Sequence, residues 1–202
     1  LHSRSRRRKS ERLVGLYCTL WDNYITFSLL SNIIATLRPA SLAEYPTIEL
    51  IAHATWPSAY GGILSPEQID YMLAMMYTSE AITSQVASGQ SFYVLETMDM
   101  KLLEKQVVGY VSQELDYQPG TTKIHKLYAL PGVQGRGYGR LMVDHVTAFA
   151  RDAGQQKLRL DVNYKNRAIG FYEKLGFGKI ERFNTDIGNG YMMEDWVMEL
   201  SL

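Results

Sequence analysis

The amino-acid sequence predicts an α+β domain in which helices come first and a sheet occupies the middle and the end of the chain. Hydrophobic residues make up 46 % of the chain and charged residues 21 %, which is a globular composition. Helical spacing of apolar residues prevails before residue 90, and strand-like alternation follows. With 202 residues and no linker-like segment after residue 33, the chain suits one domain with a little left over.

The first elements follow from periodicity and from helix-breaking residues. A strand is expected over residues 33–40, where Pro39 ends it. Apolar residues at helical spacing predict a helix around residues 47–55, and residues 57–65 are expected to form a loop.

The clearest helix start in the chain lies at Ser65. Ser65 is the expected N-cap, Pro66 takes the first helical position and Gln68 completes a capping box. A second short helix is expected to follow directly and to end at Gly89.

The rest of the chain mixes strands and helices. Strands are expected at residues 91–98, 106–117, 121–130, 157–162, 177–183 and 194–200, the first two as a hairpin. A helix over residues 139–153 carries an apolar stripe and stops at Gly154. The stripe consists of Met142, Val146, Phe149 and Ala153. A last helix is expected over residues 167–175, before Gly176.

Residues 134–139, QGRGYG, place three glycines between a strand and a helix. A Walker loop needs Lys and then Ser or Thr after its final glycine, but Arg140 and Leu141 follow here. A dinucleotide fingerprint needs Gly or Ala where Arg140 stands. Two interpretations remain: a pyrophosphate seat made of backbone amides and a helix N-terminus, or a plain glycine-rich turn.

Two motifs together resemble the GCN5-related N-acetyltransferase (GNAT) family. Gln134, Gly137 and Gly139 match the family's Gln/Arg-x-x-Gly-x-Gly/Ala signature. About thirty residues later the chain matches the family's Ala-x-x-Phe-Tyr-Glu-Lys-Leu-Gly-Phe-like helix with Ala168, Phe171, Tyr172, Glu173, Lys174, Leu175, Gly176 and Phe177. The resemblance covers roughly residues 33–200. It implies a three-layer fold with a mixed, mostly antiparallel sheet, helices on both faces and a splayed strand pair that holds the cofactor.

The resemblance implies acetyl-CoA as the cosubstrate. The expected pyrophosphate loop comprises Gln134, Gly135, Arg136, Gly137, Tyr138, Gly139 and Arg140. The pantetheine arm is expected to run along Leu127, Tyr128 and Ala129 by main-chain hydrogen bonds. The family also uses an Asn seven residues before the Tyr, but Lys165 occupies that position. Asn166 is favoured in its place, and Asn163 is the other nearby asparagine.

Acetyl transfer to an alkylamine needs a base, because such an amine has a pKa of about 10.4 and is protonated at neutral pH. The family often places a Glu two residues before the counterpart of Leu127, where this chain has His125. Glu44, Glu49, Asp70 and bulk water are the alternative bases. The resemblance makes Tyr172 the general acid for the departing thiolate and the Leu127 N–H the oxyanion donor. Core packing is the other interpretation of Tyr172.

The acceptor amine is expected near the first helices, with Trp56, Tyr60 and Tyr71 as candidate pocket residues; helix packing is the other interpretation of this aromatic set. The N-terminal half looks loosely similar to the bacterial spermidine/spermine acetyltransferases of the family. Two rival functions stay open: acetylation of a protein N-terminus or lysine, and a CoA-binding sensor without turnover. No metal is expected.

Charge and cysteine content indicate which classes of binding partner and which cell compartment to expect. Residues 1–12 hold six basic residues and one acidic residue, so the remainder holds 15 basic and 20 acidic residues, a net charge of about −5. That balance disfavours nucleic acid and mildly favours a cationic substrate. One cysteine and no long apolar run predict a cytoplasmic protein without a membrane span. Residues 1–32 are expected to be a disordered or non-native extension, residues 33–202 form the domain, and a homodimer stays open.

Overall fold

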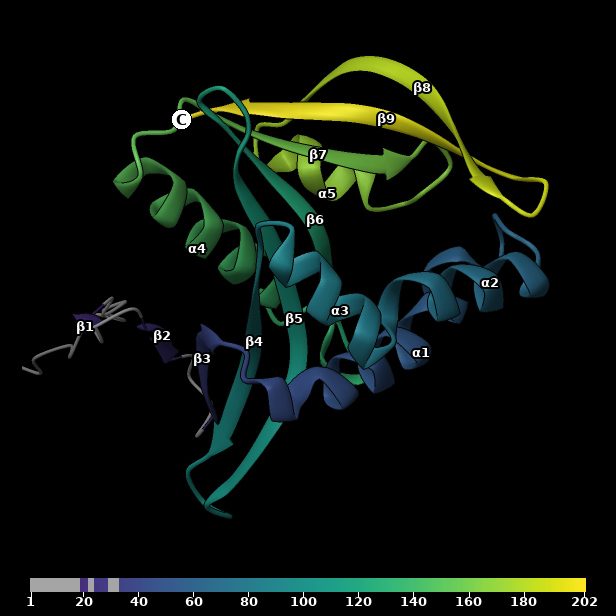
Figure 1. Ribbon diagram of the computed structural model, residues 1–202. Helices are drawn as coiled ribbons and strands as arrows, with labels where there is room; N and C mark the ends of the chain where they lie inside the picture. The colour runs from purple at the N-terminus through teal and green to yellow at the C-terminus, as the bar shows by residue number, and fades with distance from the viewer. Residues whose placement is uncertain (1–18, 22–23, 29–32) are drawn as a thin grey trace, which may run out of the picture.

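The structure, a computed structural model, describes residues 19–21, 24–28 and 33–202 (Figure 1). Its strands form one sheet in the order β1-β2-β3-β4-β5-β6-β7-β9-β8. The strands are β1 (Thr19–Trp21), β2 (Tyr24–Ser28), β3 (Ile33–Pro39), β4 (Gln90–Asp99), β5 (Glu104–Gln118), β6 (Thr121–Ala129), β7 (Lys157–Asn163), β8 (Gly178–Gly188) and β9 (Tyr191–Ser201).

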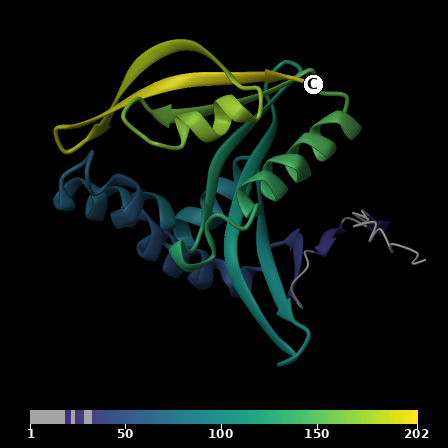
Figure 2. The same ribbon diagram turned by 180° about the vertical axis from the view of Figure 1, so that it is seen from behind.

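Helices cover both faces of this sheet (Figures 1 and 2). They are η1 (Leu42–Glu44), α1 (Tyr45–Tyr60), α2 (Pro66–Tyr77), α3 (Ser79–Ala87), η2 (Pro131–Val133), α4 (Tyr138–Asp152) and α5 (Ile169–Lys174). Helices α1, α2 and α3 pack on one face, and α4 and α5 pack on the other. The expected three-layer α+β fold is therefore confirmed.

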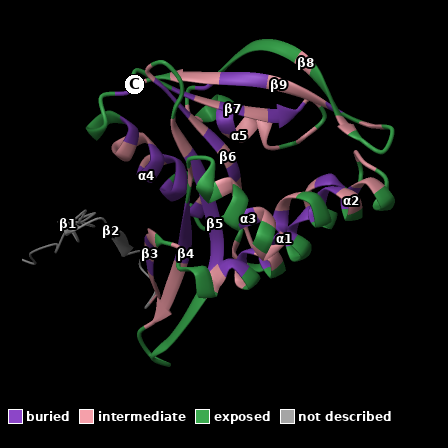
Figure 3. Cartoon of the chain, in the orientation of Figure 1, coloured by how far each residue is buried: buried purple, intermediate pink, exposed green. Residues whose placement is uncertain are grey.

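Each helix layer closes its own hydrophobic core against the central strands (Figure 3). On the α4 side, Met142 and Val146 are fully buried against Leu158 of β7. On the α1 side, Ile48 and Trp56 pack in one core with strand residues that include Val94 of β4. Burying a side chain of this size contributes about 1.5–3 kcal/mol, so both layers hold the central strands firmly.

Strands β6 and β7 are the parallel pair of the sheet, and they separate halfway along β6. Their pairing runs from Thr121 and Lys157 to Ile124 and Leu160, whereas β6 continues to Ala129. On the other edge of β6, Ser112 of β5 pairs with Lys126 while Gln113 pairs with Ile124. The residue between them, His125, is the extra residue of a β-bulge, and such a bulge bends its strand. The splayed strand pair expected from the resemblance is present here.

Two local predictions need correction. Helix α1 does not end before Pro57 but continues to Tyr60, because buried Trp56 and Tyr60 anchor its last turn although Pro57 lacks an N–H. Ser65 does cap α2, accepting from the Gln68 N–H at 3.2 Å. The Gln68 side chain does not close a capping box, because it donates instead to the carbonyl of Met192 at 3.1 Å.

The buried face of α4 differs from the predicted apolar stripe at its C-terminal end. Met142 and Val146 are buried, but Ala150 is the next buried residue, and Ala153 lies exposed beyond the last turn. The helix stops where expected, since Gly154 has a φ of 74°. Strands β8 and β9 run longer than predicted because they pair with each other as a hairpin.

The expected N-terminal extension falls mostly outside the described residues. Within residues 1–32 the structure describes β1 and β2. These strands pair antiparallel with each other, and β2 pairs with β3 at the edge of the sheet. The sequence prediction contained neither strand.

Candidate active site

A cavity of about 940 Å³ opens where β6 and β7 separate. Its walls come from the second half of β6, the glycine turn before α4, the last turns of α1, and the loop leading into α5. Of the residues expected to bind the cofactor, all but Arg136 line this cavity. The separation of β6 and β7 thus opens a cavity that is lined by segments from both helix layers.

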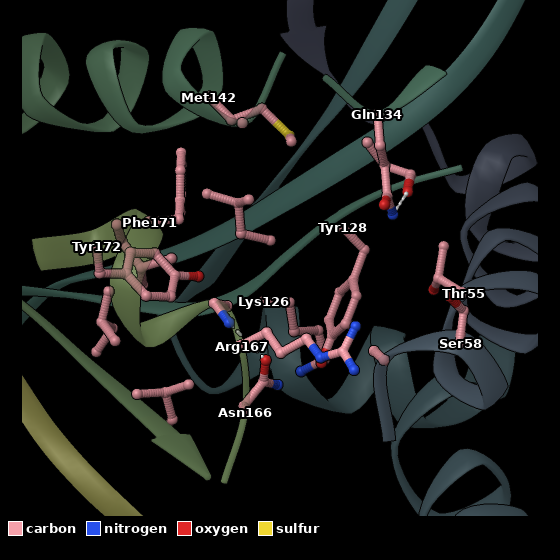
Figure 4. Close-up of a pocket in the computed structure, with 18 of the residues that line it drawn as sticks. Thr55, Ser58, Lys126, Tyr128, Gln134, Met142, Asn166, Arg167, Phe171 and Tyr172 are labelled. Atoms are coloured by element: carbon pink, nitrogen blue, oxygen red, sulfur yellow. Dashed lines mark hydrogen bonds between the residues drawn. The ribbon is translucent and has the colours of Figure 1, made fainter. Parts of the chain in front are cut away.

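The glycine turn holds the backbone in a conformation that favours glycine. Gly135 has a φ of 77° and Gly137 a φ of 85°, in the left-handed region. A Cβ atom at either position would meet nothing within 4 Å, so open space lies beside the turn. Gln134 ties the turn to the end of β6, because its amide donates to the Ala129 carbonyl at 3.1 Å (Figure 4).

The start of α4 supplies donors for an anion. Gly137 is its N-cap and provides no side-chain cap, and the first N–H groups of a helix lack partners within it. The partial positive charge of the helix N-terminus adds to these donors. Open space, glycine backbone and an uncapped helix end together fit a pyrophosphate group.

The side chains of the turn contribute less than its backbone. Tyr138 is buried in the core on the α4 side, so only its backbone belongs to the turn. Arg136 is exposed outside the cavity, and Arg140 lies exposed at its rim, 3.7 Å from Asp144. Gly139 lets α4 approach α5 closely, because a Cβ atom there would lie 3.0 Å from the ring of Phe171.

Tyr172 projects from α5 into the cavity, and its hydroxyl faces Tyr128 across the open space (Figure 4). The ring packs on Phe171 and Phe177, with centroid distances of 5.1 and 5.8 Å. Burial raises the pKa of Tyr172 well above its ordinary value, so the phenol keeps its proton at neutral pH. Tyr172 therefore presents a protonated hydroxyl to the cavity, and its role as the general acid stays a prediction.

Strand β6 alternates between the two cores. Leu127 and Ala129 contact the core on the α4 side, and Tyr128 contacts the core on the α1 side. The Tyr128 hydroxyl lies 3.2 Å from that of Tyr60, the last residue of α1. This hydroxyl pair forms a polar wall of the cavity.

His125 stands at the bulge and is held by a neighbouring strand. Its Nε2 lies 2.8 Å from Glu114, so the neutral ring donates to that carboxylate. Burial and the charges of Lys123 and Lys126 lower the pKa of His125 to about 3. His125 lines the cavity, so its role as the base stays a prediction.

Asn166, not Asn163, is the asparagine that lines the cavity. Its Oδ1 accepts from the Ala168 N–H at 2.8 Å, which fixes the loop ahead of α5, and its side chain lies beside Tyr60. Asn163 is buried, and its Oδ1 accepts from the Lys165 N–H at 3.1 Å.

The candidate acceptor residues separate in space. Tyr60 lines the cavity. Trp56 is buried in the α1 core, where its Nε1 donates to the Tyr77 hydroxyl at 3.3 Å. Tyr71 donates to the Ile187 carbonyl at 2.8 Å and so fastens α2 to the β8–β9 hairpin. Trp56 and Tyr71 therefore support the site without lining it.

The alternative bases Glu44, Glu49 and Asp70 also lie off the cavity wall. Glu44 binds Arg38 at 2.6 Å, and this hydrogen bond lowers the pKa of Glu44 to about 2. It is committed to an ion pair at the start of α1.

The predicted site residues did not include Lys126, Asp161 or Arg167, which line the cavity, or Asp195, which lies near Tyr60. Lys126 is buried beside the rings of Tyr77 and Phe92 and donates to Gln85; burial and Lys123 lower its pKa to about 8. Side chains alternate between the two faces along β7, and Leu160 lies in the core on the α4 side. This alternation could have predicted that Asp161 faces the α1 side. No local signal places Asp195, because its position follows from the pairing of β7 with β9.

A family model described as "Acetyltransferase (GNAT) family" matches residues 52–177. The chain belongs to the GNAT acetyltransferase family. It is an acetyl-CoA-dependent N-acetyltransferase, and the cavity between β6 and β7 fits this cosubstrate. Among the helices that the structure describes, none has the length and apolar character to cross a membrane.

Several GNAT relatives show how widely the likeness extends. A spermidine N(1)-acetyltransferase of Thermoplasma acidophilum is 25 % identical over 163 residues, covering 78 % of this chain and 94 % of that protein. A crystal structure of the PaiA N-acetyltransferase of Thermoplasma acidophilum in complex with coenzyme A matches with a TM-score of 0.67 at 21 % identity, over 83 % of this chain and 99 % of that one. The ribosomal-protein-S18-alanine N-acetyltransferase of Escherichia coli matches with a TM-score of 0.60 at 18 % identity, over 83 % of this chain and 93 % of that one.

Proposed function

We propose that this GNAT enzyme transfers the acetyl group of acetyl-CoA to a primary amine of a small molecule, of which a polyamine is the preferred class. The observation that carries the proposal is the cavity shared by the two helix layers. It is lined by the glycine turn and α5 from one layer and by α1 from the other. A cosubstrate seated at the turn and an amine arriving beside α1 can therefore meet between Tyr172 and Tyr128.

The two substrates are expected to react by direct attack in a ternary complex. The amine attacks the thioester carbon once it has lost a proton, and the oxyanion that forms needs a donor, for which the Leu127 N–H is proposed. Tyr172 then gives its proton to the departing thiolate. Arrangement of both reactants in one cavity supplies the proximity that direct attack requires.

Charge and shape favour a small cationic acceptor. The chain without residues 1–12 carries about −5 by the count given above, which attracts a polyamine. The tip of the β8–β9 hairpin is fastened to α2 by Tyr71 and by Gln68, at 2.8 and 3.1 Å. These two hydrogen bonds join α2 to the hairpin. We propose that they narrow the approach to the amine site, which favours a small amine over an extended peptide.

Two related proteins represent the two acceptor classes. The Thermoplasma acidophilum relative is named for spermidine, and the Escherichia coli neighbour is named for an alanine of a ribosomal protein. The first is 25 % identical over 78 % of this chain, whereas the second is 18 % identical over 83 % of it and supports the fold alone. Acetylation of a peptide terminus is the second candidate.

An acceptor screen that measures CoA release tests the proposal. Spermidine, spermine, a short diamine, a lysine peptide and a peptide with an N-terminal alanine would be compared at equal salt. We expect a polyamine to give the largest kcat/KM. A peptide preferred tenfold or more would establish the second candidate, and CoA release with none of these amines would refute the proposal that the acceptor is a polyamine.

A further inference from the structure

Asp195 is a carboxylate at the acceptor side that the mechanism above leaves unused. It lies on β9, where it pairs with Asn163 of β7 and with Phe183 of β8. Opposite residues of an antiparallel pair share a face, and Met193, two residues earlier, belongs to the core of α1, α2 and α3. Asp195 therefore points to the α1 side of the sheet.

The surroundings leave Asp195 without a counter-ion. Its neighbour on this face, Asp161, binds Lys123 at 2.5 Å and lies 3.5 Å from Arg159. Asp195 has no ion pair among the described residues, and its Oδ1 is shielded from water without a hydrogen-bond partner. A carboxylate in that state attracts a cation strongly, because its desolvation is uncompensated.

The groups that face Asp195 come from three elements. On β7 and β6 they are Asp161 and Lys123. On α1 it is Tyr60, whose pKa is raised by burial and by the nearby charge of Asp195. Tyr60 in turn contacts Tyr128 and lies beside Asn166, both of which line the cavity. Asp195 thus lies behind Tyr60, next to the polar wall of the cavity, and is not itself one of the residues that line it.

We propose that Asp195 takes the proton of the acceptor's ammonium group through the Tyr60 hydroxyl, which lines the cavity between them. This inference rests on the proposed function, since it assigns the base of the same amine transfer. Burial and the charge of Asp161 raise the pKa of Asp195 to about 6, partly offset by Lys123. A base of this pKa is ionised at pH 7 and stronger than His125, whose pKa is about 3.

The proton balance closes with the residues present. The ammonium gives one proton through the Tyr60 hydroxyl to the Asp195 carboxylate, and the free amine attacks the thioester carbon to form the C–N bond. The C–S bond breaks, and the thiolate takes the Tyr172 proton. The second proton of the new amide nitrogen returns to Tyr172 through solvent, and Asp195 releases its proton to water. The net reaction yields an N-acetyl amine, CoA thiol and one proton.

The test compares Asp195→Asn with a matched control, Glu194→Gln. Glu194 precedes Asp195 on β9 and lies on the opposite face of the sheet, 3.7 Å from Arg182. Its replacement by Gln removes the same charge as the replacement of Asp195 by Asn. With spermidine as the acceptor, Asp195→Asn should lower kcat/KM by about 10²-fold, and Glu194→Gln should change it little. In the unaltered enzyme, the acid limb of the kcat/KM profile should lie near pH 6, and Asp195→Asn should abolish that limb.

Two further measurements distinguish a base role of Asp195 from a structural effect of the substitution and from a base role of His125. Asp195→Asn should keep its acetyl-CoA affinity and its melting temperature, because the change removes a buried charge beside Asp161. His125→Gln should keep the acid limb. If Asp195→Asn turns over spermidine at the unaltered rate, or if the limb disappears in His125→Gln alone, the inference is overturned while the acetyltransferase function stands. If the unaltered enzyme acetylates no amine, the proposed function fails first.

Discussion

Replacement of Gly137 by Ala tests whether the glycine turn acts through its backbone conformation. Gly137 has φ 85° and ψ 0°, and an added Cβ would meet nothing within 4 Å. The change is therefore free of a clash, and only the left-handed conformation opposes it. That conformation costs a non-glycine residue about 1–2 kcal/mol. For a chain of this length, such a loss lowers the melting temperature by about 2–8 °C.

Ligand binding should weaken as well, because a shifted turn no longer aims its N–H groups at one phosphate. Loss of one hydrogen bond to a charged group, about 1.5 kcal/mol, weakens binding about tenfold. Acetyl-CoA at 100 times its Kd stabilises the folded state by about 2.7 kcal/mol. At the same concentration the variant would gain only about 1.4 kcal/mol, so the ligand-induced melting shift should fall by about half.

The matched control is Gly132→Ala. Gly132 lies in η2, an added Cβ there also meets nothing within 4 Å, and its φ is not positive. We expect this variant to keep or slightly raise the melting temperature, and to bind acetyl-CoA as the unaltered chain does. Calorimetric titration and thermal melting of both variants decide the matter. Equal acetyl-CoA affinity in the two would refute the role assigned to the turn.

Three other predictions follow from the same structure. Tyr172→Phe keeps the ring packing on Phe177 and should lower kcat about 10²-fold while the acetyl-CoA affinity stays unchanged. Steady-state kinetics and calorimetry measure the two quantities, and an unchanged kcat would show that Tyr172 takes no part in the reaction. His145 is buried without a hydrogen-bond partner, and burial lowers its pKa from 6.5 to about 4. The folded chain then binds fewer protons than the unfolded chain, so the free energy of unfolding should fall by about 3 kcal/mol between pH 6.5 and pH 4 on account of this group. Urea unfolding at both pH values should show that His145→Leu lacks this part of the loss, and identical pH dependence in both proteins would contradict it. Removal of residues 1–30 should preserve turnover and melting temperature, and loss of folding would show that the segment belongs to the domain.

The cofactor side of the site could be predicted from the sequence because its geometry is local. Six consecutive residues, 134–139, contain the glycines that permit positive φ and the start of the helix that supplies free N–H groups. Helix and strand spacing likewise gave the order of elements from residue 33 onward. Where prediction failed, a long-range contact overrode a local preference: burial of Trp56 and Tyr60 carries α1 through Pro57, and Met192 takes the side chain of Gln68.

The acceptor side could be predicted only in part: the sequence predicted Tyr60 as a pocket residue but not Asp195, because these residues meet only through strand pairing and helix packing. Tyr60, Tyr128 and Asp195 are far apart in the chain, and each comes from a different element. Whether a carboxylate takes a proton from an amine depends on the charges left around it: Lys123 neutralises Asp161 and leaves Asp195 free. A bulge likewise turns His125 toward Glu114. The sequence alone therefore determined the glycine turn to which we assign the cosubstrate, since backbone conformation is a local property. Only the tertiary structure decided which side chains gather at the proposed amine site, because desolvation and charge pairing depend on the whole fold.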